Sequence, residues 1–253
     1  MINNFDLSIL RLENSFKNLL IFFPLFFSRR EIVLNDVISL FIGFVIFTVM
    51  VSICYVTNDY TDRKKDKKNK LKSENIVLRR ETIIVLNLLL IFKLIIIFQL
   101  TNFGNFYLIG YLITFYLYNF FLKNFFLLDV ILLVSFYILR LFYGAELLDI
   151  TISYWFLIFF STLFLNLALF KRMIQILVNN LKKAKNNIIK YSIENISIIK
   201  KIIICSTIIN FLTVFLYFFE LFQPETFNFL SNEETRYNYD FISLVCVLLG
   251  YIF

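Results

Sequence analysis

Apolar runs long enough to cross a membrane recur from one end of this 253-residue sequence to the other. About 20 apolar residues in a helix span the roughly 30 Å hydrocarbon core of a bilayer. With 60% hydrophobic residues and a mean hydropathy of +0.78, the chain carries more apolar surface than one water-soluble core can bury. The runs are too numerous to be a signal peptide and a single anchor. We therefore expect an integral membrane protein with many spans.

These runs predict helices rather than barrel strands. In hydrocarbon every backbone N–H and C=O group must be bonded within the protein, and the runs lack the alternation of barrel strands. The sequence thus predicts an all-α, polytopic transmembrane helical bundle of about eight spans, forming a single domain over residues 1–253. Pro24 in the first run favours a tilted or partly interfacial segment. The expected spans are centred near residues 15–28, 36–57, 83–100, 105–122, 126–145, 152–170, 199–221 and 239–253.

Two strongly basic segments orient the bundle. One follows the second run, at residues 63–80, and the other follows the sixth run, at residues 171–201. The positive-inside rule places both in the cytoplasm, and the four intervening spans return the chain to the same side. Only Arg29 and Arg30 argue against this orientation. We expect a protein of the inner or plasma membrane, with its polar chemistry on the cytoplasmic side and no nucleic-acid module.

The residue inventory excludes several kinds of chemistry. The sequence has no histidine, which rules out His-based acid–base catalysis, haem ligation through His and the usual zinc sites. The three cysteines lie in apolar runs without CxxC spacing, so neither a thiolate metal site nor a disulfide framework is indicated. Any chemistry must rest on carboxylates, Lys, Arg, amides and hydroxyls.

An acidic cluster follows the second apolar run, where residues 58–66 read NDYTDRKKD. If the helix continues through it, Asn58, Asp62 and Asp66 lie within about 80° of one another, with Asp59 flanking them. Oxygen ligands at this density suit Mg²⁺ that is also bound to the phosphates of a substrate. The same spacing also fits a solvated, charge-balanced helix end in which Asp and Asn act as caps.

A second polar cluster supports the interpretation of residues 58–66 as a metal site. The predicted topology places Lys123 and Asp129 at the cytoplasmic face, at the depth of the acidic cluster. Asp129 opens a strongly apolar span, where an ionisable group is costly and tends to be functional or paired. Its alternative role is to cap the helix or to interact with the helix dipole. Arg140 lies deeper, and we expect it to pair with Glu146 or Asp149.

Residues 58–66 match the NDxxDxxxD signature of the UbiA superfamily of membrane prenyltransferases, and the chain resembles that family over nearly its whole length. It is most similar to the decaprenyl-phosphate phosphoribosyltransferase branch. Tyr118, Leu122, Lys123 and Asp129 match that branch's YSxxLKxxxxxD element. Further matches to its KN…P.F, R…AG, WF…KR and YS patterns are Lys17, Asn18, Pro24, Phe26, Arg140, Gly144, Ala145, Trp155, Phe156, Lys171, Arg172, Tyr191 and Ser192.

The chain departs from that branch at two places. Residues 69–76 read NKLKSENI where the branch usually has HPxKxxRP, so Lys72 is kept while the histidine, the arginine and both prolines are lost. The family has about nine spans around a central cavity that opens to lipid and to the cytoplasm. With about eight spans expected here, the last family span has no counterpart before Phe253.

The resemblance implies a Mg²⁺-dependent site with named residues. Asn58, Asp59, Asp62 and Asp66 would bind Mg²⁺ and diphosphate. The catalytic set it implies is Asp62, Asp66, Lys123 and Asp129. The further substrate-binding residues are Lys72, Tyr118, Lys17, Asn18, Lys171 and Arg172.

Three functions are open at this point. The first is transfer of a 5-phosphoribosyl group from phosphoribosyl diphosphate to a polyprenyl phosphate, which supplies a lipid-linked pentose for cell-envelope glycan synthesis. The second is transfer of a prenyl group from a polyprenyl diphosphate to an aromatic acceptor. The third is a transporter or a catalytically silent membrane scaffold. Ionisable residues deep in several spans would favour transport, whereas here they gather at one face, which favours an enzyme.

Overall fold

A computed structural model of the chain describes residues 12–28, 31–66, 84, 87, 105–123, 125–181 and 193–222. Every element within these ranges is helical, which confirms the all-α prediction. The elements are the 3-10 helix η2 (Leu12–Phe22), α1 (Phe23–Phe27), α2 (Leu34–Asp66), α4 (Asn105–Leu117), the π-helical turn η3 (Tyr118–Leu122), α5 (Leu128–Leu147), α6 (Tyr154–Leu181) and α7 (Asn195–Phe222).

Four helical segments are long and apolar enough to cross a membrane: Leu34–Asp62, Leu128–Leu147, Tyr154–Val178 and Asn195–Tyr217. Two of the other predicted spans form shorter apolar helices, Ser15–Phe27 and Phe106–Leu122. The predicted spans at 83–100 and 239–253 fall outside the described residues, apart from the helical Ile84 and Asn87. The chain is therefore an all-helical protein with four candidate membrane spans, while the count of eight and the central cavity stay predictions.

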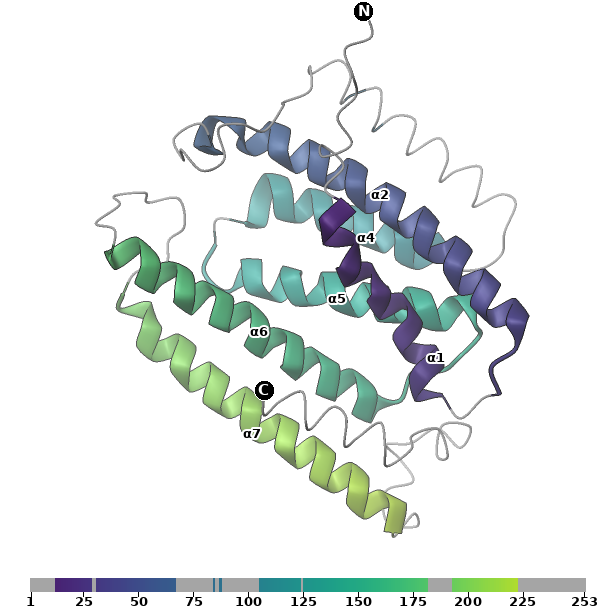
Figure 1. Cartoon of the computed structure of the whole chain (residues 1–253). Helices are drawn as coiled ribbons and strands as arrows, with labels where there is room; N and C mark the ends of the chain where they lie inside the picture. The colour runs from purple at the N-terminus through teal and green to yellow at the C-terminus, as the bar shows by residue number, and fades with distance from the viewer. Residues whose placement is uncertain are drawn as a thin grey trace, which may run out of the picture.

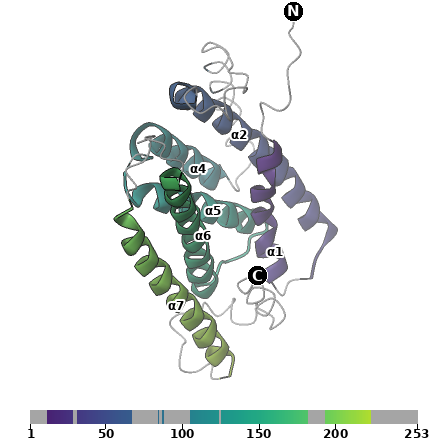
Figure 2. The same ribbon diagram turned by 60° about the vertical axis from the view of Figure 1, so that its left-hand side comes forward.

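Helix α5 is the centre of the arrangement (Figures 1 and 2). It contacts α4 and α6, and the N-terminal segment η2–α1 crosses over it. Helix α2 and helix α7 lie on opposite sides of the molecule, and α7 packs along α6. The carboxyl ends of α2 and α4 meet the amino end of α5 and the carboxyl end of α6, as the contacts described below show. We call this end of the bundle the charged end.

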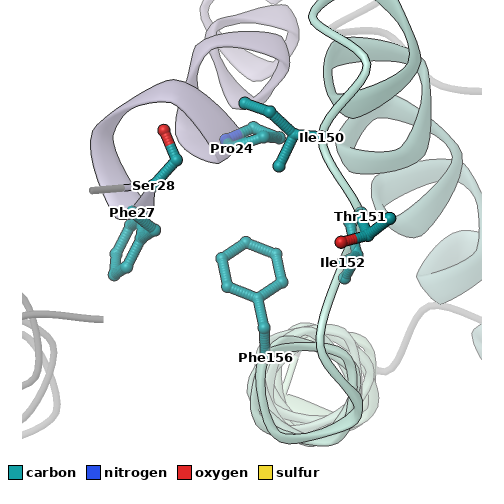
Figure 3. A pocket seen from close by; sticks show the side chains of 7 residues that line it. All are labelled: Pro24, Phe27, Ser28, Ile150, Thr151, Ile152 and Phe156. Atoms are coloured by element: carbon teal, nitrogen blue, oxygen red, sulfur yellow. The ribbon is translucent and has the colours of Figure 1, made fainter. Parts of the chain in front are cut away.

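A glycine allows the N-terminal segment to approach α5 closely. A Cβ atom at Gly144 would overlap the backbone carbonyl of Ile21, so a side chain larger than hydrogen has no room there. Beyond this crossing, Pro24 and Phe27 face Ile152 and Phe156 across a small pocket (Figure 3). Its volume of about 10 Å³ suits no more than one water molecule. The pocket is therefore a packing gap rather than a ligand site.

The buried Arg140 ties four helical elements together. Its Nε donates to Asn18 Oδ1 at 2.9 Å, Nη1 to the Phe136 carbonyl at 2.6 Å and Nη2 to the Tyr111 hydroxyl at 3.1 Å. The guanidinium also lies over the ring of Phe47, 5.5 Å from its centroid. The expected pairing of Arg140 with Glu146 or Asp149 was wrong. Those residues end α5 or follow it, whereas the N-terminal segment brings a neutral amide oxygen to the guanidinium in mid-helix.

Polar side chains also join α6 to α7. Ser206 Oγ donates to Asn166 Oδ1, and Asn166 Nδ2 donates to Thr207 Oγ1 at 3.2 Å. One turn along, Asn210 Nδ2 donates to Thr162 Oγ1 at 2.7 Å. Side-chain hydrogen bonds of this kind contribute modestly to the association of apolar helices.

Candidate functional site

Helix α2 carries the acidic cluster to the charged end without interruption. It runs as one helix from Leu34 to Asp66. The prediction that Asn58, Asp62 and Asp66 share one helix face required such a continuous helix. Asn58, Asp59 and Asp62 are half-buried in its last turns. The two carboxylates lie three residues apart, which places them on neighbouring positions of one helix face.

A π-helical turn at the end of α4 faces this cluster. The turn spans Tyr118–Leu122 and ends at Lys123, whose N–H donates to the Tyr118 carbonyl at 3.0 Å. Single π turns widen a helix locally and occur frequently at functional sites. Here the turn accompanies two side chains, Asn119 and Lys123, that reach across to α2.

Lys123 joins the two helix ends. Its ammonium lies 2.7 Å from Asp62 Oδ1, and it also donates to Asn119 Oδ1 at 3.0 Å. Thr61 Oγ1 lies 2.9 Å from the same amide oxygen. Both Lys123 and Asp62 keep part of their side chains exposed, 14% and 21% respectively. The pair therefore sits at the edge of the protein interior, within reach of a polar ligand.

The neighbouring ion pair is more deeply buried. Helix α5 starts after Leu127, which has a φ of 62° and turns the chain back into the bundle. Asp129 then lies in the first turn of α5 with 0% exposure, and its Oδ2 is 2.6 Å from Arg172 Nη2 of α6. The position suits both alternatives raised for Asp129, because a carboxylate in the first turn also interacts favourably with the helix dipole.

Tyr118 connects the two ion pairs. Its hydroxyl lies near Arg172, Asp129 and Asp62, close enough to interact electrostatically with each of them. Arg172 also donates from Nη1 to Gln175 Oε1 at 2.7 Å. The ends of α2, α4, α5 and α6 thus share one connected set of charged and polar side chains.

Five of the predicted site residues come together in this set: Asp62, Tyr118, Lys123, Asp129 and Arg172. Lys171 does not join them, since it is exposed while its neighbour Arg172 is buried. Lys72 and the side chain of Asp66 lie outside the described residues.

The predicted pair Lys17 and Asn18 is placed elsewhere. Asn18 is 1% exposed and bonded to Arg140. Arg140 follows Asp129 by eleven residues along α5, which corresponds to about 16 Å at 1.5 Å per residue. Asn18 therefore belongs to the packing of the N-terminal segment and not to the charged end.

Three polar residues of this region carried no predicted role. Asn119 is 3% exposed and accepts from Lys123, Thr61 supports it from α2, and Asn87 links α2 to α4. Asn87 Nδ2 donates to Thr57 Oγ1 at 2.9 Å, and Tyr116 donates its hydroxyl to Asn87 Oδ1 at 2.9 Å. Only the spacing of Asn119 could have indicated its role from the sequence. It lies four residues before Lys123 and so shares its helix face.

The donor set at the end of α2 fits Mg²⁺ in its chemistry. Mg²⁺ is usually held by one or two carboxylates together with waters and substrate phosphates, and Asp59 and Asp62 lie one turn apart. Within the described ranges, no three Asp, Glu, Cys or His side chains gather closely enough to form a cage by themselves. The arrangement is suited to a cation that arrives with its phosphate ligand.

No protein-family model matches this chain, and a search of characterised proteins finds no significant match to it.

Proposed function

We propose that this protein is a Mg²⁺-dependent membrane transferase that moves a 5-phosphoribosyl group from phosphoribosyl diphosphate to a polyprenyl phosphate. The observation that carries the proposal is the convergence of Asp62, Lys123, Asp129 and Arg172 from four separate helices at one end of an apolar bundle. Such a place brings together the two things the reaction requires, a charged donor and a lipid acceptor. The resemblance of residues 58–66 and 118–129 to the phosphoribosyltransferase branch points to the same substrates.

Two cations of this set are suited to phosphate oxygens. Lys123 and Arg172 are each held in place by a carboxylate, Asp62 and Asp129 respectively. Arg172 presents a planar fork of donors, and Lys123 is a compact charge on a flexible stem. Lys123 is the more accessible of the two, so it is the cation that would turn from its carboxylate to an incoming diphosphate.

Mg²⁺ would be held by Asp59 and Asp62, with Asn58 and Asp66 as the further ligands expected from the sequence. When bound, it would offset the negative charge that builds up on a departing diphosphate. The protein's own share of this work is to supply the two cations, Lys123 and Arg172, which Asp62 and Asp129 already hold near the site before the substrates bind.

The proposed chemistry needs no histidine. A phosphate monoester is already anionic near neutral pH, so an oxygen of the acceptor phosphate can attack the anomeric carbon of the donor without a general base. The new bond joins that oxygen to the anomeric carbon, and the bond from the same carbon to diphosphate breaks, with both electrons leaving on the diphosphate. Catalysis then consists of positioning the two substrates and stabilising charge.

The hydrocarbon tail of the acceptor has an apolar groove available. It lies between α5 and α6, has a volume of about 490 Å³ and is lined by Ile131, Val134, Ser135, Ile138, Phe142, Leu157, Ser161, Thr162 and Leu165. Its α6 residues Ser161 and Leu165 occupy the same helix face as Arg172, since these positions are eleven and seven residues apart. We assign this groove to the isoprenoid chain, with the phosphate towards Arg172.

The decisive assay uses membranes containing the protein, phosphoribosyl diphosphate labelled in the ribose, polyprenyl phosphate and Mg²⁺. Asp62→Ala should lower the rate of label transfer into the lipid phase at least about 100-fold, by analogy with other losses of preorganised charge. Lys201→Ala is the matched control, because Lys201 is exposed on α7 and outside the set. Equal transfer by wild type and Asp62→Ala, or transfer by neither, would contradict the proposal. Transfer seen only with a polyprenyl diphosphate and an aromatic acceptor would replace it with prenyl transfer.

A further inference from the structure

Asn119 is the most deeply buried uncharged polar side chain at the charged end, with 3% exposure. Its Oδ1 accepts from the Lys123 ammonium at 3.0 Å and lies 2.9 Å from Thr61 Oγ1. An ammonium can only donate, so the oxygen of the amide must face Lys123. The orientation of the amide is therefore fixed, and its nitrogen is directed away from Lys123.

The amide nitrogen of Asn119 is buried, and it has no hydrogen-bond partner among the described residues. Buried donors in folded proteins are nearly always paired, because leaving one unpaired costs its full desolvation. Lys123 and Thr61 need only an acceptor oxygen at this position. Within the described residues, nothing accepts from the two N–H groups of the amide, which belong to the same side chain that binds Lys123 through its oxygen.

We propose that Asn119 Nδ2 is a substrate contact, which donates a hydrogen bond to a diphosphate oxygen while Lys123 neutralises its charge. The inference rests on the proposed function, and it adds a residue from the π turn that the acidic signature does not include. It also explains the π turn, because this backbone places Asn119 and Lys123 together against α2. A neutral donor next to a flexible cation would fix the orientation of the diphosphate, which a lysine by itself does not.

Inorganic diphosphate with Mg²⁺ is the probe, and its affinity for the purified protein in nanodiscs is measured by titration calorimetry. Two variants remove the donor: Asn119→Asp keeps an oxygen for Lys123 and Thr61, and Asn119→Ala introduces no charge. Thr61→Val is the matched control, because it removes a bond to Oδ1 and leaves Nδ2 intact. Thermal unfolding without the probe is recorded for each variant to confirm that it folds.

The expected result is that both Asn119 variants bind the probe at least about tenfold more weakly, while Thr61→Val stays within about threefold. Asn119→Asp should keep the unfolding temperature of the wild type. If only Asn119→Asp loses affinity, the added charge is the cause and the inference is overturned. Wild-type affinity in Asn119→Ala overturns it as well and leaves the proposed function standing. Failure of the wild type to bind Mg²⁺–diphosphate contradicts the proposed function itself, and the inference with it.

Discussion

Two buried arginines of this protein are held in opposite ways. Arg172, at the charged end, is 9% exposed and pairs with the carboxylate of Asp129. Arg140, about three turns from Asp129 along α5, is 2% exposed, and its partners are an amide, a carbonyl, a phenol and aromatic rings. One cation is matched by a buried anion, while the other is solvated by neutral groups.

The proposed function assigns the two arginines different roles, a structural one to Arg140 and a place in the site to Arg172. The neutral groups around Arg140 come from the N-terminal segment, α4 and α5, so this cation fastens helices together and its donors are directed at the protein. At the charged end, two ion pairs, Tyr118 and the amide of Asn119 form one connected set near the protein surface. In the proposed function, this charge would be redistributed when the diphosphate binds.

The largest expected effect comes from breaking the buried ion pair. Arg172→Met leaves the Asp129 carboxylate, which is 0% exposed, without its cation, and should lower the free energy of unfolding by about 3–5 kcal/mol. Thermal or denaturant unfolding in detergent measures it. The double variant Asp129→Leu/Arg172→Met should recover most of the stability but no transfer activity. Recovery of activity as well would show that the pair is only structural.

The same Arg→Met change at Arg140 should lower the free energy of unfolding by less than the change at Arg172. Arg140→Met removes three hydrogen bonds but leaves no unpaired carboxylate, only neutral groups such as Asn18 Oδ1, and we expect a loss of about 2 kcal/mol. Affinity for Mg²⁺–diphosphate should not change. A variant that unfolds normally but no longer binds the probe would place Arg140 in the site and would erase the contrast between the two arginines.

Packing beside Arg140 can be tested with a pair of glycines. Gly144→Ala should destabilise the protein by about 1–3 kcal/mol, because the new Cβ overlaps the Ile21 carbonyl and must push the N-terminal segment away from α5. Gly110→Ala is the control, since its Cβ would meet Leu139 at an ordinary 3.6 Å. That change should stabilise the helix by up to about 1 kcal/mol. Equal unfolding temperatures for the two variants would contradict the close approach.

The smallest effect is expected from the loss of neutral hydrogen bonds between α6 and α7. Asn210→Leu removes the hydrogen bonds from α7 to Thr162 Oγ1 and to the Phe159 carbonyl of α6. Hydrogen bonds between membrane helices contribute about 0.6 kcal/mol each on average, so the loss of these two should lower the unfolding free energy by about 1 kcal/mol. A loss several times larger, measured by the same unfolding titration, would show that α7 depends on this contact for docking.

Local pattern predicted a large part of this molecule. Helical period and span length predicted the positions of the four candidate membrane helices, and the assumption that α2 continues to Asp66 was correct. Charge at the ends of the runs placed Asp62, Lys123 and Asp129 at one end, where the contacts bring them together. These features depend on spacing within single segments, or on whether an even or an odd number of spans separates two segments. Both can be read directly from a sequence.

The features that were missed depend on which distant segments meet. Nothing local to Arg140 indicates that Asn18, more than one hundred residues earlier, would reach it instead of Glu146 or Asp149. The π turn at Tyr118–Leu122 has no turn residue to mark it, yet it accompanies the placement of Asn119. Contacts between helices in a membrane follow shape and polar matching, and both are set by the assembled bundle.

The most direct test of the converged site is an experimental structure of the protein in a nanodisc, bound to an antibody fragment for size, with Mg²⁺ and diphosphate. We predict diphosphate density between the end of α2 and the π turn, within contact of Asp62, Asn119 and Lys123, with Arg172 still beside Asp129. Diphosphate bound elsewhere, or an α2 end whose Asp62 faces away from Lys123, would contradict the account.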